Sequence, residues 1–290
     1  MSSSIATKPY RVKEGSKIDL DDYATRVKPI YASEDHYEKL LRKHTDELTR
    51  YQELLYASDR YALLVIFQAM DAAGKDGAIK HVMSGVNPQG CQVYSFKHPS
   101  ATELDHDFLW RAAQRLPERG QIGIFNRSHY EEVLIVRVHR QLLEAEKLPK
   151  DLVNGKIWKQ RFRSIVDFER HLHANGTRVI KFFLHISPEE QRERLLARLD
   201  DPEKIWKFNA ADLDERRCWK DYMRAYEDAI SATSTREAPW YIVPADDKKN
   251  AHLIISRAII DTLEDLDMEY PKLTKAQAES MKTVRAQLEA

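Results

Sequence analysis

The chain has 290 residues, and its 46 Lys and Arg equal its 46 Asp and Glu, so the formal net charge at pH 7 is zero. With no overall charge excess, nothing in the composition favours a nucleic-acid-binding or membrane-surface protein. Two cysteines, Cys91 and Cys218, lack a CxxC or Cys/His spacing, which argues against structural zinc and a disulfide framework. No signal segment starts the chain and its apolar runs are only strand length, so we expect a soluble cytoplasmic protein.

The chain is long enough to bury a sizeable core. Residues 1–33 are polar and interrupted by Pro9, Gly15 and Pro29, which predicts an extended arm. From Ser33 onwards, apolar residues at helical spacing predict a helix to about Ala57. The residues after 270 form a polar tail, so we place the main domain at 34–270.

The rest of the chain alternates apolar segments with helical patterns. Strands are predicted at 61–67, 91–96, 121–125, 178–186 and 240–243. Helices are predicted at 75–84, 102–115, 130–145, 157–174, 188–199, 212–230 and 253–266. This alternation indicates an α/β fold of three layers, with a five-stranded parallel sheet between helices.

The stretch that follows the first strand has the order of a phosphate-binding loop. Residues 63–67 are apolar, a loop of small residues with Gly74 and Lys75 follows, and then a helix begins. The match to GxxxxGK[ST] is imperfect, because Ala69 replaces the first glycine and Asp76 replaces the Ser or Thr. Asp71 would oppose a bound anion unless it recruits a cation such as magnesium. The alternative is an ordinary turn with Lys75 at the surface.

A second polar motif, residues 126–132, follows the third strand. In parallel sheets ligands bind beyond the carboxyl ends of the strands, so we expect Arg127 beside the loop. Glu131 fits either a second magnesium ligand or a solvated helix charge. Lys97 and Arg111 are weaker candidates for substrate contact. The basic segment at 192–212 suggests a lid, with Arg194 and Arg198 on one helix face, although both could instead pair with neighbouring acids.

Several motifs in order resemble the polyphosphate kinase 2 family. They are Met70–Gly77, Phe125–Glu131, Lys181–Gln191, Asp201–Lys207 and Ala238–Asp246, and the resemblance covers about residues 35–270. It implies a P-loop kinase fold, polyphosphate as phosphoryl donor, magnesium as cofactor with manganese as an alternative, and a nucleotide as acceptor. The carboxylate at Glu131, with Asn126 earlier in the motif, resembles the branch that phosphorylates both AMP and ADP.

The resemblance also implies roles for individual residues. Asp71 and Glu131 would hold the metal, and Lys75 and Arg127 would bind the phosphoryl group in flight. The remaining candidates for binding polyphosphate or nucleotide are Ala72, Ala73, Gly74, Asp76, Gly77, Lys80, Lys97, Arg111, Asn126, Arg137, Arg194, Arg198, Lys204 and Lys207.

We therefore expect a reversible transfer of the terminal phosphoryl of polyphosphate to AMP and ADP. Adenine nucleotides are the expected acceptors, with guanine nucleotides as an alternative, and the resemblance suggests a homo-oligomer. Two other functions stay open from the sequence. One is a nucleoside monophosphate kinase that uses ATP, and the other is a scaffold that binds polyphosphate or nucleotide without turnover.

Overall fold

A computed structural model of the chain describes residues 5–203, 205–207 and 211–290. Its centre is a sheet with the strand order β2-β3-β1-β4-β5, in which each neighbouring pair is parallel. The strands are β1 (Ala62–Ala69), β2 (Cys91–Ser95), β3 (Ile122–Asn126), β4 (Thr177–His185) and β5 (Trp240–Pro244). The predicted five-stranded parallel sheet is confirmed.

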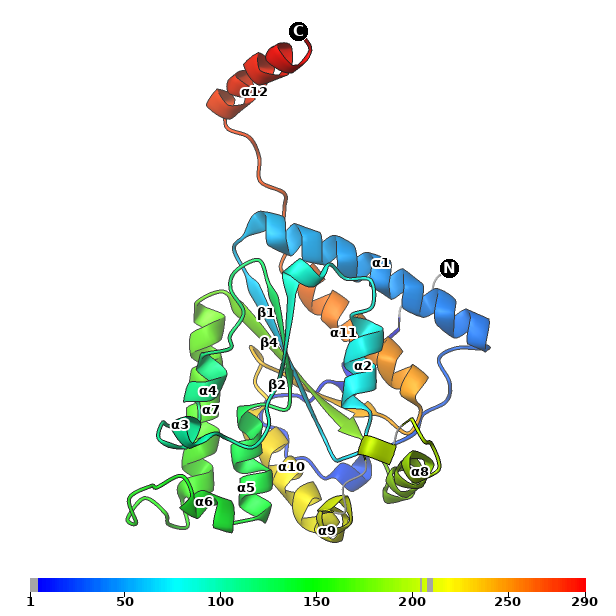
Figure 1. Ribbon diagram of the computed structural model, residues 1–290, viewed down its shortest axis with the longest axis vertical. Helices are drawn as coiled ribbons and strands as arrows, with labels where there is room; N and C mark the ends of the chain where they lie inside the picture. Colours follow the sequence, from blue (N-terminus) through cyan, green and yellow to red (C-terminus); the bar gives the residue numbers. More distant parts are fainter. Residues whose placement is uncertain (1–4, 204, 208–210) are drawn as a thin grey trace.

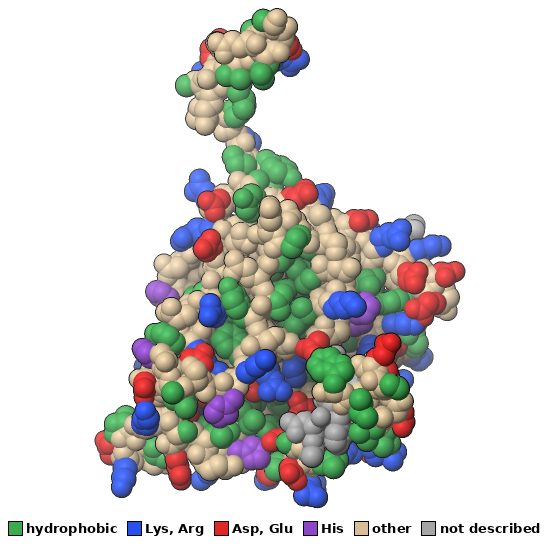
Figure 2. Space-filling view, viewed as in Figure 1, with side chains coloured by type: hydrophobic (Ala, Val, Ile, Leu, Met, Phe, Trp, Pro, Cys, Tyr) green, Lys and Arg blue, Asp and Glu red, His purple; other side chains and the backbone are tan. Residues whose placement is uncertain are grey.

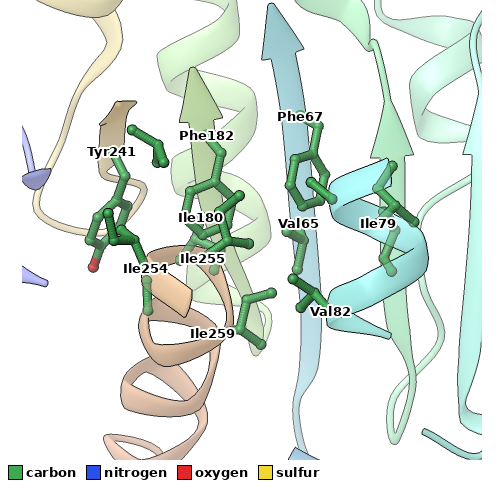
Figure 3. Packing of buried hydrophobic residues seen from close by; sticks show 14 of the residues in the cluster. Val65, Phe67, Ile79, Val82, Ile180, Phe182, Tyr241, Ile254, Ile255 and Ile259 are labelled. Atoms are coloured by element: carbon green, nitrogen blue, oxygen red, sulfur yellow. The ribbon is translucent and has the colours of Figure 1, made fainter. Parts of the chain in front are cut away.

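Helices cover both faces of this sheet (Figure 1). One face packs against α1 (Glu34–Ser58), α2 (Lys75–Val82) and α11 (Lys248–Glu264), and the other against α7 (Ile157–Ala174) and α10 (Trp219–Thr233). The whole of β1 is buried, which explains why its sequence is an unbroken apolar run. Figure 3 shows Val65 and Phe67 of β1, beside Ile180 and Phe182 of β4, facing residues of α2 and α11.

The remaining helices are α3 (Ala101–Leu104), α4 (Trp110–Ala113), α5 (Ile135–Val138), α6 (Gln141–Glu144), α8 (Pro188–Leu199), α9 (Ala211–Arg217) and α12 (Lys275–Leu288). All of them except α8 and α12 are short. Helix α12 projects away from the sheet and has no buried residue (Figure 1). Among the described residues, none of the helices combines the length and apolar character needed to cross a bilayer.

Three predicted helices are wrong as single elements. The one at 102–115 is divided into α3 and α4, because Asp107 Oδ1 accepts a hydrogen bond from the Leu109 amide at 2.9 Å and competes with helical bonding. The one at 130–145 is a 3-10 turn (His129–Val133) followed by α5 and α6, since the Tyr130 amide donates to Ser128 Oγ. The one at 212–230 is interrupted at Cys218, whose amide donates to the Glu215 carbonyl three residues earlier at 3.1 Å, as in a 3-10 turn.

The N-terminal segment lies along the edge strand β5. It contains two 3-10 turns, Lys8–Tyr10 and Leu20–Asp22. The Val12 amide donates to the Trp240 carbonyl at 2.8 Å, and Arg11 forms an antiparallel bridge with Tyr241. Because Val12 is buried in the core, this segment covers backbone groups that an open edge strand would expose.

Candidate phosphoryl-transfer site

Residues 70–74 join β1 to α2, and their backbone turns sharply. Gly74 has φ of 102° and Ala72 has φ of 61°, both in the left-handed region that favours glycine. The turn brings the N-terminus of α2, with its unpaired amides, to the carboxyl end of the sheet. Such an end attracts anions, so the local geometry is that of a phosphate-binding loop.

Lys75 is the first residue of α2, and its side chain lies against the loop. Nζ donates to the carbonyl oxygens of Ala69 and Met70, at 2.8 and 3.4 Å. Burial lowers the pKa of Lys75, and the nearby Arg127 lowers it further, whereas Asp71 and Glu131 act in the opposite direction. The loop carbonyls thus hold an ammonium group beside the place where an anion would enter.

Arg127 follows β3 and reaches across to the same loop. Its amide donates to the Phe67 carbonyl of β1 at 3.0 Å, and its φ of 63° is unusual for a residue with a side chain. The guanidinium lies 3.2 Å from Asp71 Oδ1. Burial alone would lower the pKa of Arg127, but the charges of Glu131 and Asp71 raise it above its ordinary value. A permanent cation therefore sits beside Lys75, as the sequence predicted.

Two further contacts connect the motif after β3 to the loop and to β1. Asn126 Nδ2 donates to Asp76 Oδ1 at 2.6 Å, and Gln68 Nε2 donates to Ser128 Oγ at 3.1 Å. Burial raises the pKa of the half-buried Glu131, although Arg127 and Lys75 both lower it. Gln68 also lowers the pKa of Glu131.

Asp71 and Glu131 have the chemistry that a magnesium ion requires. The charge on Asp71 raises the pKa of Glu131, so the two carboxylates repel each other across the site. In the described part of the chain, no group of three or more His, Cys, Asp or Glu could hold a metal by itself. Magnesium needs only one or two carboxylates when phosphate oxygens complete its shell, so this pair fits such an ion.

A cleft of about 800 Å³ opens over the loop and the end of β3. Figure 2 shows Lys and Arg side chains gathered around a hollow on the lower part of this face. Twelve predicted site residues line the cleft: Asp71, Ala72, Ala73, Gly74, Lys75, Asp76, Gly77, Lys97, Asn126, Arg127, Arg194 and Arg198. The fold thus brings together residues from the ends of β1, β2 and β3 and from α8.

Arg194 lines the cleft, but its guanidinium is already bonded to protein. Nη1 donates to the carbonyl of Ala73 at 2.7 Å, Nη2 to that of Ala245 at 2.6 Å, and Nε to Glu190 at 2.8 Å. The expected role in substrate binding is therefore less well supported than a role in holding the loop. The Arg198 guanidinium, which was expected to bind substrate at the cleft, forms an ion pair with Asp212 at 3.6 Å.

Other predicted residues lie away from the cleft lining. The buried Arg111 donates to the Lys97 carbonyl at 2.8 Å and to Glu132 at 2.9 Å, which suits a role in placing Lys97. Arg137 pairs with Asp228 at 2.5 Å, and Lys80 is exposed on α2. Glu131 is half-buried and is not among the residues that line the cleft. Lys204 and the side chain of Lys207 lie outside the described residues.

The cleft also has lining residues that sequence reasoning missed. Ser95, Phe96 and His98 surround Lys97 at the end of β2, where the rule for strand ends could have found them. A second group, His81, Ala197, Lys248 and His252, comes from three helices and follows no sequence pattern. His81 and His252 stack with ring centroids 4.6 Å apart, so α2 and α11 meet at this wall.

Comparison with known proteins gives consistent results. The model of the family described as Polyphosphate kinase 2 (PPK2) matches residues 31–271. An ADP-polyphosphate phosphotransferase from Rhodopseudomonas palustris is 60% identical over 285 residues, which is 98% of this chain and 99% of that protein. An AMP/ADP-polyphosphate phosphotransferase from Meiothermus ruber is 50% identical over 78% of this chain and 80% of that protein.

A solved structure has the same fold. The crystal structure of polyphosphate kinase 2 from Arthrobacter aurescens TC1 superposes with a TM-score of 0.87 at 38% sequence identity, covering 98% of this chain and 99% of that one. The family match spans most of the chain, and its range includes the loop, Arg127 and the residues that line the cleft. The chain belongs to the polyphosphate kinase 2 family.

Proposed function

We propose that the protein transfers the terminal phosphoryl group of inorganic polyphosphate to ADP and to AMP, and that the transfer is reversible. In the forward direction the bridging P–O bond at the end of the polyphosphate breaks. A new P–O bond forms to the terminal phosphate oxygen of the nucleotide, so polyphosphate becomes one unit shorter. The single observation that carries this proposal is the position of Lys75 and Arg127 with Asp71 in the lining of one cleft.

Phosphoryl transfer depends mainly on positioning and on charge stabilisation. The loop amides and Lys75 would hold the transferred group from one side, and Arg127 from the other. The acceptor is an anionic phosphate oxygen, so no side chain has to remove a proton from it. This agrees with the lining of the described cleft, which offers cations and amides around the loop.

Asp71 and Glu131 would hold a magnesium ion, for which manganese is an alternative. When bound, the ion neutralises phosphate oxygens and helps fix their orientation. Both carboxylates lie next to a cation of this chain, Asp71 at Arg127 and Glu131 near Arg127 and Lys75. The ion would therefore share these carboxylates with the side chains that receive the phosphoryl group.

The choice of acceptor is the finer part of the proposal. The names of both relatives include ADP, and the Meiothermus ruber protein is named for AMP as well. The residue types at Asn126 and Glu131, with the carboxylate at the later position, are the pattern that suggested use of both acceptors. In the structure Asn126 Nδ2 donates to Asp76 Oδ1. Cytoplasmic location, a homo-oligomeric state and the use of guanine nucleotides stay predictions.

One experiment tests the proposal directly. The pure protein is incubated with polyphosphate and, in turn, AMP, ADP, GMP or GDP, with magnesium present or removed by a chelator, and the products are separated by chromatography. We expect ATP from ADP, and ADP followed by ATP from AMP, both only with the metal. A parallel incubation of AMP with ATP and no polyphosphate tests the alternative donor. Product only in that incubation would contradict the proposal.

A further inference from the structure

A cluster of polar side chains is enclosed in the core behind the candidate site. Lys181 of β4 and Glu169 of α7 are 0% and 1% exposed, and Tyr130 and His129 are both 0% exposed. Lys181 Nζ donates to Glu169 Oε2 and, at 2.9 Å, to the Thr233 carbonyl. The Tyr130 hydroxyl donates to Glu169 Oε1 at 2.9 Å, and His129 Nε2 lies 3.8 Å from the same oxygen.

Burial of such a charge pair needs a physical explanation. Removing two ions from water is costly, and apolar residues of the same volume often give equal or greater stability. Burial raises the pKa of Glu169, but Lys181 and His129 together hold it below its ordinary value, so the carboxylate is ionised. An ionised acceptor makes stronger hydrogen bonds than a neutral one. The pair therefore supplies a strong, fixed acceptor deep in the core.

This acceptor is hydrogen-bonded to Tyr130 and lies beside His129, and both residues belong to the motif that serves the cleft. His129 and Tyr130 lie in the chain between Arg127 and Glu131. Arg127 has φ of 63°, a conformation that persists only where the surroundings enforce it. The residues on either side of Arg127 help enforce it, Asn126 through its contact to Asp76 and Ser128 through its contact to Gln68 of β1. On the C-terminal side, the Tyr130 ring packs edge-on against Trp240, with centroids 4.8 Å apart, and its hydroxyl ends on Glu169.

We propose that Glu169, with Lys181 behind it, is a positioning residue that anchors Tyr130 and thereby fixes Arg127 and Glu131 at the cleft. Glu169 does not touch the substrate and acts through the backbone of residues 127–131. The inference rests on the proposed function, because the effect expected at Glu131 is on metal binding. It differs from a purely stabilising role, in which the cluster would only contribute to the free energy of unfolding.

Tyr130→Phe is the main test, because it removes the hydroxyl and keeps the buried ring. We expect kcat to fall between about tenfold and a hundredfold, with a similar weakening of Mn²⁺ binding measured by electron paramagnetic resonance with ADP present. This binding measurement requires no turnover. The matched control is Ser256→Ala, which removes another buried hydrogen bond, 2.7 Å to His44 between α1 and α11. The control should lower Tm and leave kcat and the Mn²⁺ affinity unchanged.

A graded pair of variants adds a second readout. Glu169→Gln keeps an oxygen acceptor for Tyr130, whereas Glu169→Leu removes it, so Mn²⁺ affinity should decrease in the order wild type, Gln, Leu. Wild-type kcat and Mn²⁺ affinity in Tyr130→Phe would overturn the inference, as would equal losses in Tyr130→Phe and Ser256→Ala. A wild-type protein that makes no ATP from polyphosphate would instead overturn the proposed function. In that case, unchanged Mn²⁺ affinity in Tyr130→Phe would overturn this inference as well.

Discussion

Gln191 of α8 connects the carbonyl of Asp71 to Arg216 of α9. Its Nε2 donates to the Asp71 carbonyl at 3.1 Å, and its Oε1 accepts a hydrogen bond from Arg216 at 2.8 Å. The amide is 1% exposed, so water cannot readily replace either bond. The Gln191 side chain therefore connects α9, which borders the expected lid, to the loop that carries Asp71, a predicted metal ligand.

The change Gln191→Leu should reduce kcat by about tenfold, because Asp71 loses a contact that fixes its backbone. Steady-state kinetics with ADP and polyphosphate would measure the effect. Glu193→Gln, on the exposed side of the same helix, is the control and should have normal kinetics. Equal kcat in both variants would mean that the link does not serve the reaction.

Arg194 provides a second connection between α8 and the loop. Its Nη atoms bond to the carbonyls of Ala72 and Ala73 on one side and of Ala245 and Asp246 on the other. Lysine cannot reproduce this planar set of donors, so Arg194→Lys should leave buried carbonyls unpaired and cost about 2 kcal/mol. Urea unfolding would measure the loss. The same substitution at the exposed Arg192 is the control, and an equal effect at both positions would contradict this explanation.

The sequence could predict the sheet and the loop, because both depend on local patterns. The apolar run before Ala69 and the small residues before Lys75 indicate a buried strand, a tight turn and a helix N-terminus. Arg127 was placed correctly near the loop by a topological rule, since strand ends in a parallel sheet lie at one edge. These predictions required no knowledge of how distant side chains pair.

The parts of the site that could not be predicted depend on contacts between residues that lie far apart in the sequence. Arg194 has the sequence appearance of a basic lid residue, yet four carbonyls from two separate loops satisfy it. The motif after β3 looks helical, but Glu132 turns inward to Arg111 and Tyr130 turns to Glu169. The histidines of α2 and α11 meet only because those helices share one face of the sheet. None of these contacts has a fixed spacing along the chain.

The predicted site residues lead to a direct test of catalysis. Asp71→Asn and Lys75→Ala should each lower the transfer rate by at least about a hundredfold, since each removes a charge placed at the transferred group. Circular dichroism should show an unchanged fold. Asp105→Asn changes an exposed aspartate that pairs with Lys147 outside the cleft, so its rate should be normal. Nearly normal rates in either site variant would be incompatible with the assignment.

Glu131→Gln addresses the proposed metal site. The amide keeps the shape of the carboxylate and removes its charge, so the magnesium concentration for half-maximal rate should rise at least about tenfold. Titration of magnesium at saturating ADP would measure it. Glu144→Gln, at an exposed position of α6, should leave the titration unchanged. If Glu131 is only a structural charge, the variant and the wild type will have the same magnesium requirement.

The last prediction concerns stability at low pH and a residue remote from the cleft. His44 of α1 is buried, and Nδ1 lies 2.7 Å from Ser256 Oγ. Burial lowers the pKa of His44 from 6.5 to about 4. In the unfolded chain, His44 therefore becomes protonated below pH 6.5, whereas in the folded chain it becomes protonated only below about pH 4. The free energy of unfolding therefore decreases as the pH falls through this range.

When the pH falls from 7 to 4.5, protonation of His44 in the unfolded chain should lower the free energy of unfolding by about 2 kcal/mol. The variant His44→Gln should lack this decrease. Burial also raises the pKa of Glu132 to about 7, which acts in the opposite direction, but that contribution is present in both proteins and cancels in the difference. Urea unfolding at the two pH values measures the slope. His171→Gln, at an exposed position, should keep the wild-type slope. Parallel pH curves for the wild type and His44→Gln would show that His44 is protonated without penalty in the folded protein.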